Sequence, residues 1–209
     1  MSDNDNNITY INGAQNNGDI TYTSSSSFNP AEYGVTQLIK ALGENPLREG
    51  LVDTPKRVVK AYKELTEGYN VNIAELLSVT FDVGNVDEMV IVKNINFVSL
   101  CEHHMLPFSG TATVAYIPMH RVVGLSKIPR TVDAITRRLQ VQERITTEIT
   151  EALDTYLKPL GSACLVKAEH TCAAYRGVRK QGAEMVTSSL TGVFRNPEVR
   201  NEFLALANS

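Results

Sequence analysis

The sequence lacks tryptophan, has only three cysteines and contains no long hydrophobic run. An odd and small number of cysteines does not fit the disulfide framework of a small secreted protein, and it favours free thiols in a reducing compartment. No apolar stretch approaches the ~20 residues of a membrane span, and the N-terminus lacks the basic-then-apolar layout of a signal peptide. The net charge of -3 argues against a general nucleic-acid binder. We therefore expect a cytoplasmic protein that binds neither membranes nor nucleic acid.

Basic residues are also missing from the first 30 positions, which are rich in Asn, Ser, Gly and Asp. A segment with so little apolar surface and so little charge to pair has nothing to bury, so residues 1–30 are predicted to be a disordered tail. The remaining residues, 31–209, are predicted to form one domain. It would consist of a helical part over 31–79 and a second part over 80–209.

Hydrophobic spacing predicts the order of the elements. Helical periodicity runs through "AEYGVTQLIKALGE" and "DTPKRVVKAYKELTEGY", where Gly68 is expected to end the second helix, and a short third helix is expected at "NIAELLSV". Two strands are predicted around "CEHH", then two helices with a break near Gln140. Two more strands follow at "ACLVKAEHTCAAYR" and "EMVTSSLTGVF", and a helix closes the chain. The predicted fold class is α+β, with an antiparallel sheet backed by a helix pair.

Cysteine and histidine cluster in two short segments. Cys101 and His104 are three residues apart, and His170 and Cys172 are two apart. Residues two apart on a strand point to one face, so the second pair is expected to converge on one point. Thiolate and imidazole together suit zinc better than magnesium or calcium. The alternative is that the cysteines are small core residues and the histidines form ordinary hydrogen bonds.

The number of candidate ligands is compatible with two kinds of zinc site, one closed and one open. All four residues together would give a closed structural site with no position for chemistry. If His170 does not bind, the site keeps an open position for water, and His103 and His170 remain as free imidazoles, which proton transfer around a hydrolysis needs. The spacing favours the open site only modestly.

Two further segments concentrate positive charge in an acidic protein. "GLSKIPR" is expected to begin a helix at Ser126, and Lys127 and Arg130 would join the free N–H groups there in an anion site. "AYRGVRK" adds Arg176 and two more cations close after Cys172. The alternative is a solvated helix end with surface charges. Glu143 in "QVQERIT" is likewise open to interpretation as an ordinary exposed helix residue that pairs with a nearby Arg.

Six segments together resemble the GTP cyclohydrolase I family: "GENPLREGLVDTPKRV", "CEHHMLPFSG", "VVGLSKIPR", "RRLQVQERIT", "EHTCAAYRGV" and "TSSLTGVF". They occur in the family's order and cover about residues 31–207. One small departure is Ala173, where members often have Met. The resemblance implies the tunnelling fold, with its β-β-α-α-β-β order, and a toroidal homodecamer whose active sites are shared between subunits.

The resemblance also implies a reaction and a role for each site residue. Zinc held by Cys101, His104 and Cys172 would supply the water that attacks C8 of the guanine ring of GTP. Ring opening, loss of formate and rearrangement of the ribose would give 7,8-dihydroneopterin triphosphate. His103 and His170 would transfer protons, and Glu143 with Gln142 would read the guanine edge. Ribose and triphosphate contacts would come from Ser126, Lys127, Arg130 and Arg176, and from Arg57 of another subunit.

Two other functions are considered beside this one. The first is another tunnelling-fold enzyme, such as a nitrile reductase of the deazaguanine pathway, which would use a nucleophilic Cys and NADPH and would leave the paired histidines unexplained. The second is a zinc-stapled oligomer without activity, in which His170 closes the site.

Overall fold

The computed structural model describes residues 28–82, 84 and 86–209. The predicted tail lies almost wholly outside these residues, so its disorder stays a prediction. The chain folds as two compact units, one of residues up to Val58 and one from Val59 onward. Among the described residues, no helix combines the length and the apolar character that crossing a bilayer requires.

The N-terminal unit holds helix α1 (Pro30–Ala41) and the start of α2 (Thr54–Leu65). Asn29 caps α1, because its side-chain oxygen accepts a hydrogen bond from the Ala31 N–H, and Pro30 occupies the first turn, where its missing N–H costs nothing. The turn between the helices carries an exposed Arg48–Glu44 ion pair.

Between α2 and the sheet, the chain forms the 3₁₀ helix η1 (Glu67–Asn70), α3 (Ile73–Leu77) and strand β1 (Thr80–Asp82). The prediction that Gly68 ends α2 is wrong, because α2 stops at Leu65 and Gly68 lies inside η1. A Cβ at Gly68 would lie 2.4 Å from the Ala134 carbonyl oxygen, so this glycine is required for close approach to helix α4 (Lys127–Thr136).

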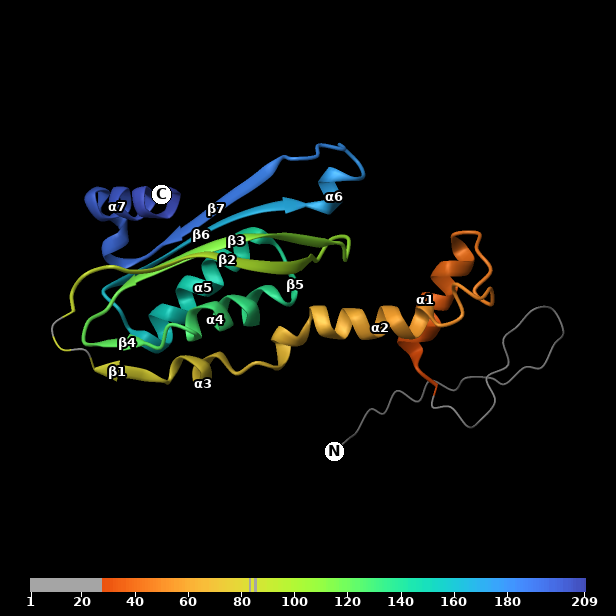
Figure 1. Ribbon diagram of the computed structural model, residues 1–209, viewed down its shortest axis with the longest axis horizontal. Coiled ribbons are helices and arrows are strands. Elements are labelled where there is room, and N and C mark those ends of the chain that lie inside the picture. Colours follow the sequence, from red (N-terminus) through yellow and green to blue (C-terminus); the bar gives the residue numbers. More distant parts are fainter. Residues whose placement is uncertain (1–27, 83, 85) are drawn as a thin grey trace, which may run out of the picture. The chain divides into compact units, whose positions relative to one another are not determined.

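The main sheet has the strand order β5-β2-β3-β6-β7. Long antiparallel pairings join its four main strands: β2 (Val90–Cys101), β3 (Pro107–Ile117), β6 (Gly161–His170) and β7 (Glu184–Leu190). Between β3 and β6 the chain forms β4 (Arg121–Val123), α4 (Lys127–Thr136), β5 (Leu139–Gln140) and α5 (Gln142–Leu157). The β-β-α-α-β-β order of the tunnelling fold is confirmed, as is a break between the paired helices at Gln140 (Figure 1).

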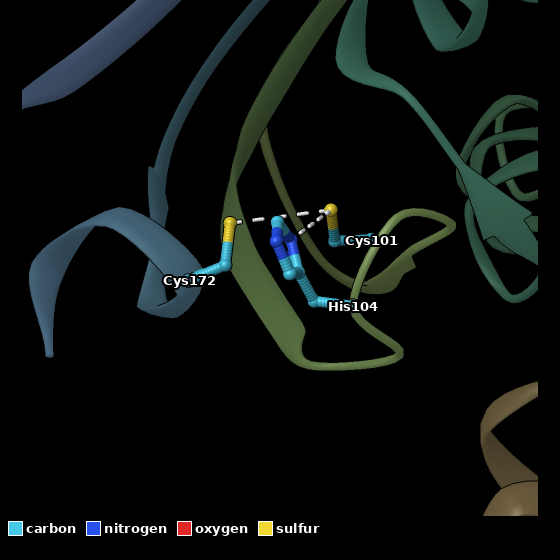
Figure 2. Close-up of side chains that lie close together, drawn as sticks. All are labelled: Cys101, His104 and Cys172. Carbon is cyan, nitrogen blue, oxygen red and sulfur yellow. Dashed lines mark hydrogen bonds between the residues drawn. The ribbon is translucent and has the colours of Figure 1, made fainter. Parts of the chain in front are cut away.

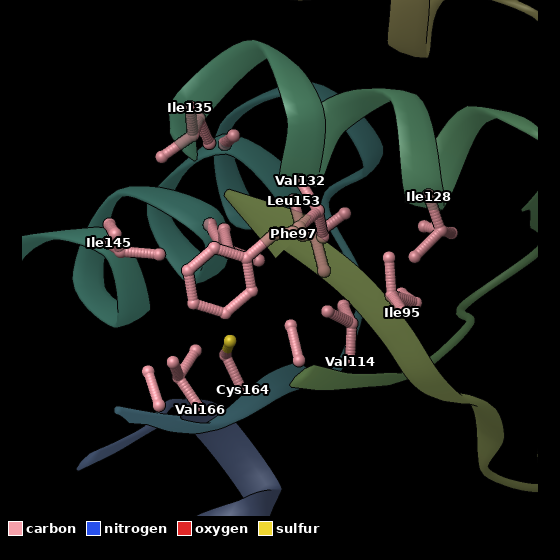
Figure 3. Packing of buried hydrophobic residues seen from close by; sticks show 14 of the residues in the cluster. Ile95, Phe97, Val114, Ile128, Val132, Ile135, Ile145, Leu153, Cys164 and Val166 are labelled. Carbon is pink, nitrogen blue, oxygen red and sulfur yellow. The ribbon is translucent and has the colours of Figure 1, made fainter. Parts of the chain in front are cut away.

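Helices α4 and α5 cover one face of this sheet and bury the main core. Phe97 lies between the sheet and apolar side chains of both helices, among them Val132, Ile145 and Leu153 (Figure 3). Alternate residues of β6 divide between the two faces: Cys164 and Val166 face this core, whereas Ala163 and Leu165 join a second cluster. That alternation is the period of two expected of a strand buried on both sides.

The second face is covered at one end by η2 (Gly192–Arg195) and α7 (Pro197–Asn208) (Figure 1). The rings of Phe194 and Phe203 are both fully buried there and meet edge to face, with centroids 5.8 Å apart. The expected C-terminal helix is therefore confirmed.

Three details differ from the predicted strands. The strand expected through "HTCAAYR" stops at His170, and the next four residues form the helical turn α6 (Thr171–Ala174). The last predicted strand ends at Leu190 and continues into η2. Sequence patterns also gave no sign of β5, which adds a short parallel edge beside β2, or of the small β1–β4 sheet. Pairings of two or three residues are too short to leave a periodic signal.

Candidate metal centre and active site

The connection between β2 and β3 forms a tight loop that presents Cys101 and His104. The Cys101 N–H donates to the Leu106 carbonyl at 2.8 Å, and the Cys101 carbonyl accepts from the N–H groups of His104 and Met105 at 3.3 and 2.7 Å. Met105 adopts a left-handed conformation, with φ of 54°. This turn puts the His104 imidazole beside the Cys101 thiol, with 3.8 Å between Nδ1 and Sγ.

Cys172 reaches the same point from α6. Its Sγ lies 4.0 Å from that of Cys101, and the ligand atoms of Cys101, His104 and Cys172 all lie within 4.8 Å of one another (Figure 2). A tetrahedral zinc ion with usual bond lengths separates two thiolate sulfurs by about 3.8 Å and sulfur from nitrogen by about 3.6 Å. The three side chains are therefore close enough together to hold one metal ion.

The prediction that His170 and Cys172 share one face of a strand is wrong. Because β6 ends at His170 and Cys172 lies in a helical turn, the two side chains diverge instead of sharing a strand face. In the described part of the chain, the cluster with ligand spacing contains Cys172 but not His170.

Electrostatics at the two thiols favour a bound cation. Burial and the neighbouring Cys101 thiol raise the pKa of Cys172, against a smaller opposing effect of Arg176. Two thiolates 4 Å apart repel each other in a partly buried site, and a divalent cation between them removes that penalty. By contrast, Cys164 is a fully buried core thiol far from any ligand role, and burial strongly raises its pKa.

His170 is held beside this cluster by stacking and by one hydrogen bond. Its ring lies nearly parallel to that of the buried Phe108, with centroids 4.3 Å apart. Its Nε2 is 2.9 Å from the side-chain oxygen of Gln142. Burial lowers the pKa of His170 below its ordinary value near 6.5, and the charge of Glu143 opposes that shift.

The hydrogen bonds of Gln142 determine the tautomer of His170. The Gln142 amide nitrogen donates to the carbonyls of Val166 and Met185, which cannot donate in return, and these two bonds set the orientation of the amide; the nitrogen also lies 3.3 Å from the Thr187 hydroxyl oxygen. Its oxygen must then accept, and the His170 Nε2 must carry the proton. A neutral His170 consequently has its lone pair on Nδ1.

Three consecutive residues at the start of α5 serve the site in different ways. Gln142 is buried against His170, as described above, whereas Glu143 is exposed. The Glu143 carboxylate has no hydrogen bond or ion pair within residues 28–82, 84 and 86–209. Arg144 forms a bidentate ion pair with Glu102, with N–O distances of 2.7 and 3.2 Å. Glu102 belongs to the connection between β2 and β3, and we call residues 101–106 the metal loop. Among the described residues, the alternative that Glu143 pairs with a nearby Arg is therefore not seen.

The second histidine of the loop, His103, is exposed, and its ring centroid lies 6.3 Å from that of His104. Adjacent residues in this turn diverge, so one imidazole faces the thiols and the other faces solvent. His103 is thus free to meet a ligand placed next to the cluster.

The predicted phosphate group is not assembled beside the metal cluster within one chain. Ser126, Lys127 and Arg130 lie at the start of α4, next to β4, whereas β5, which follows the end of α4, pairs with Cys101 (Figure 1). The ten residues of α4 separate these two ends by about 15 Å. Ser126 occupies the N-cap position, but its side chain makes no capping bond.

The other two predicted phosphate contacts belong to other segments of the chain. Arg176 follows α6 and is close enough to Cys172 for its charge to lower that thiol's pKa. Arg57 belongs to the N-terminal unit, where its guanidinium contacts Gly50, Asp53 and Thr54.

Comparison with known proteins places the chain in a family. The family model described as GTP cyclohydrolase I matches residues 31–208. The chain is 51% identical over 173 residues to a GTP cyclohydrolase 1 of Leptospira biflexa, covering 82% of this chain and 94% of the relative. It is 52% identical over 174 residues to a GTP cyclohydrolase 1 of Allorhizobium ampelinum, covering 83% and 87%. The chain belongs to the GTP cyclohydrolase I family. Membership makes it an enzyme, and the family assignment made from the six motifs is confirmed.

Several residues that support the site were not predicted. Phe108 stacks on His170, Glu102 and Arg144 tie the metal loop to α5, and the Thr171 hydroxyl donates to the Pro107 carbonyl. Each acts through a partner distant in the sequence, so no local pattern in this family member marks it.

Proposed function

We propose that this member of the GTP cyclohydrolase I family is a zinc-dependent hydrolase that converts GTP and water into formate and 7,8-dihydroneopterin triphosphate. In this reaction both C–N bonds of guanine C8 break, C8 leaves as formate, and the rearranged ribose carbons close the new ring. The observation that carries the proposal is the three-residue cluster of Cys101, His104 and Cys172, beside which His170 is held away from the ligand position.

The cluster suits zinc as an open, catalytic site. The Cys101 Sγ lies 3.8 Å from the His104 Nδ1 and 4.0 Å from the Cys172 Sγ, spacings close to those between the ligands of a tetrahedral zinc ion. Zinc, when bound there, supplies a nucleophile at neutral pH by lowering the pKa of the water that it coordinates. The engagement of His170 with Gln142 supports the open site over the closed four-ligand alternative.

We assign proton transfer to the two histidines that are not ligands. His170 presents an Nδ1 lone pair while its Nε2 proton is committed to Gln142, and its lowered pKa keeps that lone pair available at neutral pH. His103, exposed beside His104, is assigned the second proton transfer.

Guanine recognition is assigned chiefly to Glu143. Its two carboxylate oxygens have no partner in the described chain, and two parallel donors, the guanine N1–H and 2-amino group, match one carboxylate. Gln142 has its amide nitrogen and its oxygen bonded internally, so the direct guanine contact predicted for it has weaker support. We propose that Gln142 acts by orienting His170.

We propose that the triphosphate contacts come from a second copy of the chain. Ser126, Lys127 and Arg130 lie at the opposite end of α4 from the metal loop, which supports a site built from the metal cluster of one subunit and the helix start of another. We therefore propose a homo-oligomer, with the decamer implied by the family resemblance as the specific assembly. Arg176 and Arg57 stay proposed phosphate contacts.

Incubation of the zinc-loaded full-length protein with GTP tests this function. We expect one formate per GTP consumed and a product that becomes fluorescent as a pterin after oxidation. NADPH-dependent reduction of a nitrile without formate would support the deazaguanine-pathway alternative. Bound zinc with no turnover of either substrate would support the stapled oligomer.

A further inference from the structure

The hydroxyl of Tyr62, near the end of α2, makes a contact that the proposed mechanism does not use. It donates a hydrogen bond of 2.8 Å to the carbonyl of Met105, 43 residues away. Tyr62 and Met105 both belong to the unit that begins at Val59. Met105 immediately follows the ligand His104, so this bond reaches the metal loop at the residue next to one of its ligands.

Met105 is the conformationally unfavourable point of that loop. A left-handed φ of 54° is unusual for a residue with an unbranched apolar side chain, and glycine or asparagine normally takes such a position. The peptide N–H of Met105 donates to the carbonyl of Cys101, and the peptide on its other side is fixed by the Tyr62 hydroxyl. The His104–Met105 peptide is thus bonded to Cys101 and the Met105–Leu106 peptide to Tyr62, so the conformation of Met105 sets how these two peptides of the loop lie relative to each other.

The same contact contributes little to folding stability. The Met105 carbonyl lies in an exposed part of the surface, so water replaces the Tyr62 hydroxyl when that hydroxyl is removed, and no buried acceptor is left without a partner. What water does not replace is the fixed direction of the bond. The hydroxyl thus affects the geometry of the loop more than the stability of the fold.

We infer that Tyr62 is a positioning residue of the metal centre, which holds Met105 in its left-handed conformation so that the His104 imidazole and the Cys101 thiol stay at ligand spacing. This inference rests on the zinc centre of the proposed function. It assigns to α2 a role in metal affinity that is separate from substrate binding.

Tyr62→Phe tests the inference because it removes only the hydroxyl. Outer-shell partners of metal sites typically change affinity 10- to 100-fold, and for this indirect contact we expect zinc affinity, measured by competition with a chromogenic chelator, to fall about tenfold. The matched control is Tyr156→Phe, because the Tyr156 side chain is 46% exposed and its hydroxyl has no hydrogen bond within the described residues. The control should bind zinc as the wild type does. The urea midpoint of the metal-free protein should be unchanged in both variants.

A second substitution tests the mechanism of the effect. Asparagine tolerates the left-handed region, and the Met105 side chain is exposed, so Met105→Asn in the Tyr62→Phe background should recover most of the lost affinity. The absorption bands of the cobalt(II)-substituted protein should change in Tyr62→Phe and return in the double variant. Loss of affinity that Met105→Asn leaves unrepaired would overturn the role assigned to the Met105 conformation.

Two outcomes separate this inference from the proposed function. Equal zinc affinity in Tyr62→Phe and in the wild type overturns the inference and leaves the zinc centre intact. If the wild-type protein binds no zinc, the metal centre itself is wrong, and the inference is overturned with it.

Discussion

The two ends of helix α4 differ in how their polar side chains are partnered. Past its C-terminal end, near the metal loop, Arg138 and Gln140 bond to backbone carbonyls and to Glu148. At its start, the side chains of Ser126, Lys127 and Arg130 have no hydrogen bond or ion pair within residues 28–82, 84 and 86–209. The metal end is thus completed by its own chain, whereas the other end has groups available for an anion. The proposed catalytic centre needs both the metal cluster and the anion-binding helix start, and within one chain these two parts lie at opposite ends of α4.

The largest effect is expected from removing a metal ligand. Cys101→Ala and Cys172→Ala should each lose both zinc and activity, because a three-ligand site cannot spare a thiolate. His104→Ala should do the same. Zinc content by elemental analysis and formate release from GTP are the measurements.

Cys164→Ala is the matched control for these thiols. Cys164 lies in the core, fully buried and remote from the cluster, so its loss should lower the free energy of unfolding but leave zinc content normal. Stoichiometric zinc in Cys101→Ala or Cys172→Ala would mean that the ligands are assigned wrongly.

His170→Ala should keep zinc while kcat falls about 100- to 10,000-fold, the usual contribution of a general acid or base. Burial lowers the pKa of His170, so the residue stays neutral until the pH drops below the ordinary histidine pKa of about 6.5. If neutral His170 is needed for catalysis, kcat/KM of the wild type should fall only below that pH. A pH profile of kcat/KM with its acidic limb above 6.5 would contradict that assignment. Loss of zinc in His170→Ala would support the closed site.

A mixing experiment addresses the separation between the two ends of α4 directly. Arg130→Ala removes a predicted phosphate contact, and His170→Ala removes a proton-transfer group at the other end. If sites combine two subunits, co-assembled mixtures of these poorly active variants should regain roughly a quarter of wild-type activity, since a quarter of the sites then hold two intact halves. Activity that stays at the level of the separate variants after verified subunit exchange would place both groups in one chain's site.

Much of this arrangement was predictable from the sequence. The element order, the break at Gln140 and the convergence of Cys101 with His104 all follow from local spacing. The position of Cys172 was predicted for an incorrect reason: the expected strand ends at His170, and a helical turn rather than strand alternation brings the thiol to the cluster. The distance between the phosphate group and the metal loop depends on how α4 lies across the sheet, and no local pattern encodes it.

A smaller effect is expected at Glu143. Glu143→Gln replaces one acceptor oxygen with a donor that faces a donor on guanine, at a cost of roughly 1–3 kcal/mol in kcat/KM for GTP. Discrimination against ITP, which lacks the 2-amino group, should shrink. Zinc content should stay normal because the carboxylate is not a ligand. An unchanged GTP/ITP ratio of kcat/KM would mean that Glu143 is only an exposed helix residue.

The smallest effect is expected from shortening the N-terminus. Removal of residues 1–27 keeps Asn29, which caps α1, and keeps Phe28, whose ring packs 5.9 Å from that of Tyr33. Activity and oligomer size by light scattering should stay close to those of the full chain. Collapse of the assembly on truncation would show that the predicted tail has an essential structural role.

In the proposed function, one zinc ion held by Cys101, His104 and Cys172 serves hydrolysis at guanine C8. The most direct measurement is formate released per GTP consumed, by protein stripped of metal and then titrated with zinc. We expect no formate without metal, and formate release that rises linearly and saturates at one zinc per chain. Full formate release from the metal-free protein, or a zinc-saturated protein that releases none, would contradict it.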